Sequence, residues 1–251
     1  GRLWTHSDGS HGWDFILNGP ISAASAQEHG TQVAGIVAQM TANPGSLVQL
    51  MPLRVSPLAS ALVADALYFA SDNGADVINM SLFMSEHSPT VTTALEYAGS
   101  QNRLVVVAAG NSGLDLKIQP RWPALDGLTL KNVVTVQGVG DQTFPALSDH
   151  ASGLSFLAAP ARCICTTAKG GNTWSEIGDT SAAAPIVSGA AALILADQRF
   201  ANWHAPPNLA SLLMTNSKIA EQSRSTDFDD LARQFRFNTL NLKFMERVLE
   251  K

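Results

Sequence analysis

The chain has 251 residues, of which 45% are hydrophobic, so it can bury a sizeable core in one α/β domain or in two small ones. A net charge of −5, with no Lys/Arg run longer than a pair, argues against nucleic acid and anionic membrane surfaces as partners. No apolar run reaches the roughly 18 residues that a membrane span requires.

Strand-like segments alternate with helix-like segments along the first half of the chain. The strand-like segments are continuous Val, Ile and Leu runs, which are typical of strands buried on both faces of a parallel sheet. The helix-like segments between them suit right-handed βαβ crossovers. In chain order we expect strand 48–55, helix 58–74, strand 76–82, helix 88–102, strand 103–109 and short strands at 132–139, 154–159 and 162–168. This order predicts one α/β domain with a mostly parallel sheet.

Residue types that bind metals occur in two places, but their spacing fits no metal site. Cys163 and Cys165 share one face of a strand and are too close for an easy disulfide, so we expect free or packed thiols. A cysteine metal site would need a second pair. The opening stretch GRLWTHSDGSHGWDF holds two histidines and two aspartates at irregular spacing, namely His6, Asp8, His11 and Asp14. We interpret this stretch as a loop.

Three stretches carry residues suited to nucleophilic catalysis. EHGTQVAGIVAQM starts a helix with His29, VVVAAGNSG leads from a buried strand into Asn111, and GDTSAAAPIVSGAAALILA starts a helix with Ser181. A serine in the first helical turn has an unpaired backbone N–H at the positive end of the helix dipole, which suits a developing oxyanion. A histidine could take the serine proton. Each stretch alone also fits a helix cap or a turn, so only their joint occurrence indicates a site.

The segments HGTQVAGIVA, DVINMSL, VVVAAGNSG and DTSAAAPIVSGAAALIL resemble, in order and spacing, the signature blocks of subtilisin-like serine proteases. The resemblance runs from Gly1 to the final TLNLKFMERV and implies a single peptidase domain over 1–251. It implies a three-layer sandwich in which a mostly parallel sheet, of about seven strands, has helices on both faces. It also implies peptide-bond hydrolysis through an acyl-enzyme. The connection after the His29 helix is short, so we expect no calcium loop there, and neither a cofactor nor a metal.

The resemblance also assigns roles to individual residues. His29 would be the general base, Ser181 the nucleophile, and the Asn111 amide with the Ser181 N–H the oxyanion hole. Two segments would form the walls of the substrate cleft: Asn79, Ser81, Leu82 and Phe83, and Ala108, Ala109 and Gly110. A peptide or protein substrate would pair with their backbone as an added strand. An inhibitory propeptide is a further partner that the resemblance allows.

The chain departs from the family pattern at the third triad member. A D-[S/T]-G motif precedes the stretch that GRLWTHSD resembles, so the catalytic aspartate is expected two residues before Gly1, with the domain truncated just after that motif. Asp8 and Asp14 are the alternative acids within the chain. The missing acid leaves open a catalytically impaired peptide-binding scaffold, and a transamidating relative is a third alternative. Glu28 and Asp179 stand where the family pattern has glycine. Two interpretations remain open: both are solvated loop acids, or they favour basic substrate residues near the scissile bond.

Overall fold

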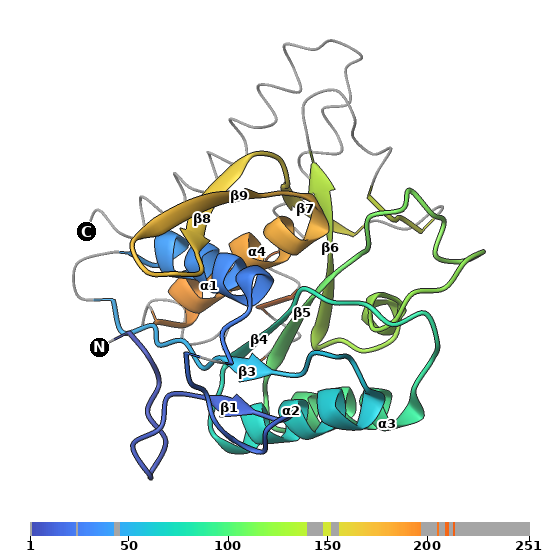
Figure 1. Cartoon of the computed structure of the whole chain (residues 1–251). Coiled ribbons are helices and arrows are strands. Elements are labelled where there is room, and N and C mark those ends of the chain that lie inside the picture. The colour runs from blue at the N-terminus through green and yellow to red at the C-terminus, as the bar shows by residue number, and fades with distance from the viewer. Residues whose placement is uncertain are drawn as a thin grey trace.

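Figure 1 shows the computed structural model of the chain, which describes residues 2–23, 25–42, 46–139, 148–151, 156–196, 205, 209–210 and 213. Residues 43–45, in the connection expected to lack a calcium loop, and the tail from 214 onward lie outside the described residues. The helices are α1 (Glu28–Met40), α2 (Ser60–Asp72), α3 (Pro89–Ser100), the short 3-10 helix η1 (Ala124–Leu128) and α4 (Asp179–Ala196). The strands are β1 (Trp13–Asp14), β2 (Gly19–Pro20), β3 (Leu53–Arg54), β4 (Val77–Met80), β5 (Leu104–Ala108), β6 (Val133–Val139), β7 (Leu157–Pro160), β8 (Ile164–Ala168) and β9 (Thr173–Ile177).

The central sheet is parallel and has the order β4-β5-β6-β7. Because its strands run the same way, their carboxyl ends share one edge, and open α/β sheets form their sites at that edge. The α/β class and the parallel sheet are confirmed. Within the described residues this sheet has four strands rather than about seven. The strand expected at 48–55 is reduced to β3 in a separate small sheet, and the one expected at 162–168 forms a hairpin with β9.

β5 shows how the helices cover both faces of the sheet. Its side chains alternate, with Val106 and Ala108 in the core beneath α4 and Val105 and Val107 in the core beneath α2 and α3. All five residues of the strand are buried, which explains why the strand is apolar throughout. α4 is apolar and long enough to cross a membrane, yet 61% of it is buried inside the fold, as befits a core helix of this three-layer arrangement (Figure 1).

The β8-β9 hairpin, of which only the first strand was expected, covers α1. Thr166 donates its hydroxyl to the carbonyl of Gln32 at 2.8 Å, and the Thr167 hydroxyl donates to the carbonyl of Thr31 at 2.9 Å. Gly35 permits this approach, because a Cβ there would collide with both threonine hydroxyls. The two cysteines at the start of the hairpin are free thiols, as expected, and both are exposed.

A buried ion pair holds together the small sheet β2-β1-β3. The Arg54 guanidinium donates to the Asp14 carboxylate at 2.7 Å, and the aspartate side chain is 0% exposed. Burial alone would raise the pKa of Asp14, but hydrogen bonds from Ser25, Arg54 and the backbone N–H groups of Leu17 and Ile16 outweigh it and hold the pKa far below its usual value. The pair therefore stabilises the folded chain with Asp14 ionised.

We predict that Asp14→Asn lowers the free energy of unfolding by about 3 kcal/mol, because it leaves Arg54 without its partner in a largely buried site. The stabilisation by the wild-type carboxylate is fully present above its unfolded pKa of about 3.9 and is lost as the pH falls towards the lower folded pKa. Urea unfolding at pH 7 and at pH 3 measures both effects. An equal difference between the two proteins at both pH values would contradict the prediction.

Candidate active site

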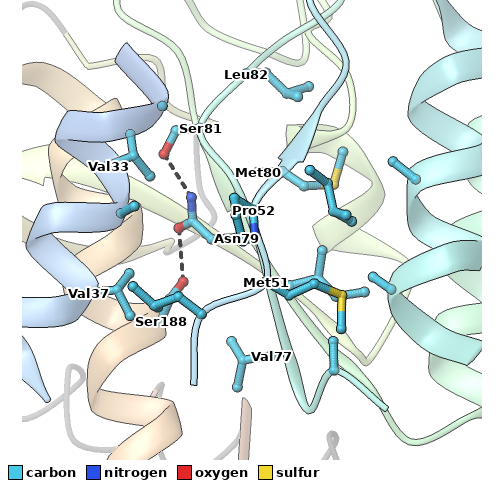
Figure 2. Close-up of a pocket in the computed structure, with 18 of the residues that line it drawn as sticks. Val33, Val37, Met51, Pro52, Val77, Asn79, Met80, Ser81, Leu82 and Ser188 are labelled. Atoms are coloured by element: carbon cyan, nitrogen blue, oxygen red, sulfur yellow. Dashed lines mark hydrogen bonds between the residues drawn. The ribbon is translucent and has the colours of Figure 1, made fainter. Parts of the chain in front are cut away.

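One cleft, of about 1430 Å³, brings together the three residues expected to perform catalysis. His29 lines it from the start of α1, Asn111 from the turn after β5, and Ser181 from the first turn of α4. The cleft also extends along β4 and the segment that leads into β3, and Figure 2 shows this part. The positions are far apart in sequence and meet because α1 and α4 lie side by side (Figure 1).

The first turn of α4 holds Ser181 in a defined place. Its backbone N–H belongs to the first turn, where no helical carbonyl accepts it. The Ser81 hydroxyl donates to the Ser181 carbonyl at 3.0 Å. The helix starts at Asp179 with φ +62°, a left-handed conformation that costs an L-residue about 1 kcal/mol and that glycine adopts freely. This conformation explains why relatives have glycine at the position of Asp179.

Thr180 fixes the orientation of the Asn111 side chain. The Asn111 amide oxygen accepts hydrogen bonds from the Thr180 N–H at 2.9 Å and from the Thr180 hydroxyl at 2.5 Å. With its oxygen bound in this way, the amide can offer only its N–H₂ group to a ligand. Thr180 is buried and also accepts the Gly110 N–H at 3.2 Å. Sequence reasoning assigned no role to Thr180, although the DTS segment contains it.

The turn that carries Asn111 is shaped by Asp149, a second residue that sequence reasoning missed. Its carboxylate is fully buried and accepts the backbone N–H groups of Ser112 at 2.9 Å and Leu114 at 2.8 Å. Gly110 has φ +113°, and a Cβ at that position would collide with the Asp149 carboxylate. Both the conformation and the space therefore require glycine at 110.

His29 is exposed at the start of α1, and partial desolvation lowers its pKa below the usual value. The neutral imidazole, which can accept a proton, is therefore favoured at neutral pH. Among the described residues no hydrogen-bond partner fixes the tautomer of this ring. The adjacent Glu28 faces the hairpin instead, where its carboxylate accepts the Lys169 N–H at 2.9 Å and the Ser175 hydroxyl at 3.3 Å.

A chain of polar side chains connects β4 to α4, and Figure 2 shows its central part. The Ser188 hydroxyl donates to the Asn79 amide oxygen at 2.9 Å, and the Asn79 amide nitrogen donates to the Ser81 hydroxyl at 3.0 Å. Ser81 in turn donates to the carbonyl of Ser181. Asn79 and Ser81 line the cleft, but these hydrogen bonds tie both side chains to α4.

The remaining residues expected in the substrate walls divide into two groups. Leu82, Phe83, Ala108 and Gly110 line the cleft, and Phe83 is 47% exposed. Ala109 does not line it, because its side chain is fully buried in the cluster that contains Leu116 and Ala124. Neither Glu28 nor Asp179 lines the cleft, and the Glu28 carboxylate is bound to the hairpin.

The deep part of the cleft lies between two unpaired strand edges. Within the described part of the chain, β4 and β3 are each the last strand of their sheets, and residues of both line the cavity. Val33 and Val37 of α1, together with Met51 and Val77, give this part an apolar surface (Figure 2). Backbone N–H and C=O groups on such buried edges need partners. The cavity, which we call the strand slot, therefore has the properties of a site for one further strand.

The acids near the amino terminus do not reach this cleft. Asp14 is bound to Arg54, and Asp8 lies in an exposed turn with His6 Nδ1 at 3.1 Å. Neither of the two aspartates lines the cleft that holds His29. Within the described ranges no three potential metal ligands gather at one point.

Comparisons with known proteins identify the family of this chain. Residues 8–237 match the model of the subtilase family. The chain is 32% identical over 200 residues to the thermophilic serine proteinase of Bacillus sp. (strain AK1), covering 75% of this chain and 47% of that protein. Thermitase of Thermoactinomyces vulgaris is 31% identical over 202 residues, covering 76% and 69%. The crystal structure of a cold-adapted subtilisin-like serine proteinase superposes with a TM-score of 0.68 at 28% identity, covering 82% of this chain and 73% of that one. The chain thus spans about half of one of these relatives and about two thirds of another, and it belongs to the subtilase family.

Proposed function

We propose that this chain is the main part of the catalytic domain of a serine endopeptidase. The observation that carries the proposal is that His29, Asn111 and Ser181 all line one cleft. The relatives named above are serine proteinases, which supports the same chemistry. The fixed orientation of Asn111 supports a role as an oxyanion donor, since such donors act best when they are preorganised.

The proposed reaction is acyl transfer in two steps. The Ser181 hydroxyl attacks the peptide carbonyl carbon while a ring nitrogen of His29 takes its proton, and the Asn111 amide and the Ser181 N–H receive the oxyanion. The C–N bond then breaks, and His29 returns the proton to the leaving amine. Water, deprotonated by His29, attacks the acyl-enzyme and releases the second product together with free Ser181. No cofactor takes part in these steps.

We further propose that the strand slot receives an extended segment whose last residue is an acid. A strand added parallel to β4 would end at the same edge as Ser81, next to the part of the cleft that His29 lines. A carboxylate there would accept a hydrogen bond from His29, fix its tautomer and stabilise the imidazolium that forms. Without such a segment, the described residues provide no acid to orient His29. For the isolated chain, the alternative function is therefore a catalytically impaired scaffold that binds peptides.

The first experiment compares fluorophosphonate labelling of two proteins. One is the chain joined at Gly1 to a designed apolar strand of about six residues that ends in Asp-Ser, and the other carries Asn-Ser instead. We expect the aspartate version to label at Ser181 about 10⁴ times faster, which is roughly the cost of losing the corresponding aspartate in a subtilisin, a relative of this chain. Ser181→Ala should abolish labelling in both.

Three outcomes distinguish the functions. Peptide hydrolysis with labelling at Ser181 supports the endopeptidase. Products that carry an added peptide amine instead of water support the transamidating alternative. If the aspartate version is folded by circular dichroism yet remains unlabelled, the scaffold alternative replaces the proposal.

A second prediction concerns the titration of His29. In the chain alone, desolvation should make His29 titrate below its ordinary value of about 6.5, so it stays neutral and basic at pH 7. The added aspartate should raise the pKa, because a nearby carboxylate favours the charged imidazolium. NMR titration of the imidazole carbon-bound protons measures both values. The asparagine version is the control, and an equal pKa in the two fusions would contradict the proposed contact.

A third prediction concerns Asn79 as a positioning residue. Asn79→Ala removes the link between Ser188 and Ser81, so the Ser181 peptide loses a fixed contact. We expect kcat of the aspartate fusion to fall about 10- to 100-fold while KM changes little, since small displacements of reacting groups have effects of this size. Asn73→Ala, at the end of α2, is the matched control. Equal losses in the two variants would remove the argument for positioning.

A further inference from the structure

We propose that Arg121, together with Phe83, forms a subsite that binds an acidic side chain of the peptide substrate. The proposal rests on the proposed function, because it names the substrate class of the same cleft. It begins from Phe83, an exposed aromatic side chain that lines the cleft two residues after Ser81. The Arg121 guanidinium lies over this ring, with its carbon 5.4 Å from the ring centroid.

The two segments that carry these side chains are joined firmly. Met84 donates its N–H to the Trp122 carbonyl at 2.6 Å and accepts the Trp122 N–H at 3.0 Å. The ring of Trp122 also contacts His87 at a centroid distance of 4.4 Å. Arg121 is therefore held beside Phe83 by backbone pairing of the adjacent residues, and not only by its own flexible side chain.

The charge of Arg121 is not neutralised within the described part of the chain. Arg121 has no ion pair there, and its buried Nε has no hydrogen-bond partner. A guanidinium stacked on an aromatic face keeps its in-plane N–H donors available, and their fork geometry matches a carboxylate. With no ion pair among the described residues, the positive charge of Arg121 is left for a ligand carboxylate.

Four acids of the described part of the chain have other contacts. Asp126 accepts the Thr92 hydroxyl at 3.1 Å, Asp149 accepts two backbone N–H groups, and Glu28 binds the hairpin. Asp76, an acid that lines the cleft, is at the amino end of β4 and lies 3.7 Å from Arg103. A substrate carboxylate next to Phe83 would thus meet a cation without competition from these four groups. The expected preference is acidic, opposite to the basic preference suggested by Glu28 and Asp179.

Equilibrium binding of matched peptides tests this subsite without requiring turnover. Fluorescent peptides that differ only by Glu, Gln or Lys, with the variable residue moved through successive positions, are titrated with the chain, and anisotropy is measured. At one position we expect Glu to bind about tenfold more tightly than Gln, with Lys weakest, and we expect the preference to shrink with added salt. Arg121→Gln should remove the preference and Arg121→Glu should reverse it.

Lys131→Gln is the matched control, because Lys131 is an exposed cation at the amino end of β6. It removes one positive charge far from Phe83 and should leave the ratio of Glu to Gln affinity unchanged. If Arg121 only packs on the Phe83 ring and binds no carboxylate, Arg121→Glu will change the affinities of the Glu, Gln and Lys peptides equally. That result would contradict the proposed subsite. Failure of every peptide to bind overturns it as well. An acidic preference, combined with a folded aspartate fusion whose Ser181 remains unlabelled, would instead refute the peptidase proposal and leave the subsite standing.

Discussion

The arrangement of the site depends on the close packing of α1 against α4. Gly189 of α4 lies against Met40 of α1 so tightly that a Cβ at 189 would be 2.6 Å from the Met40 Cβ. The hairpin presses on the other side of α1 at Gly35, again without room for a side chain. These contacts hold the two helices side by side (Figure 1), so that both begin at the same cleft. Small residues, rather than polar contacts, therefore bring His29 and Ser181 together.

At the carboxyl edge of the central sheet, a fully apolar strand is followed directly by a polar turn. β5 is buried on both faces and tolerates no polar side chain, yet the turn directly after it exposes Asn111. Gly110 allows the change of direction, and the buried Asp149 carboxylate satisfies the backbone N–H groups that the turn exposes. Thr180 then ties this turn to the first turn of α4. The apolar core ends where this network of hydrogen bonds begins, and the network gives the Asn111 amide, the proposed oxyanion donor, a defined orientation.

Local patterns predicted most of the fold, and long-range pairs explain what they missed. β5, α2 and α3 begin and end within two residues of the expected bounds, because apolar periodicity and helix caps are local signals. The strand expected at 48–55 is reduced to β3. This strand pairs with β1 in the small sheet, and its other edge borders the strand slot instead of pairing with the central sheet. The pairs Asp14–Arg54 and Asn79–Ser188 join residues 40 and 109 positions apart, and no motif connects them. For the site, the family resemblance pointed to residues that line the cleft, except for Ala109, which is buried in the core, and it gave no role to Thr180 or Asp149, whose contacts are with neighbouring residues.

Catalysis and selectivity are built from separate parts of this fold. The proposed chemistry depends on α1, α4 and the strand slot, whereas the proposed acidic subsite depends on residues near Phe83 and Trp122, which are joined by backbone pairing. A change at Arg121 can alter a substrate side chain's binding energy without moving Ser181, because its stacking partner belongs to the cleft wall and not to α4. In the proposed mechanism, an aspartate in the strand slot would act on His29 and not on Arg121. Selectivity can therefore vary among sequences of this fold while the geometry of the nucleophile stays the same.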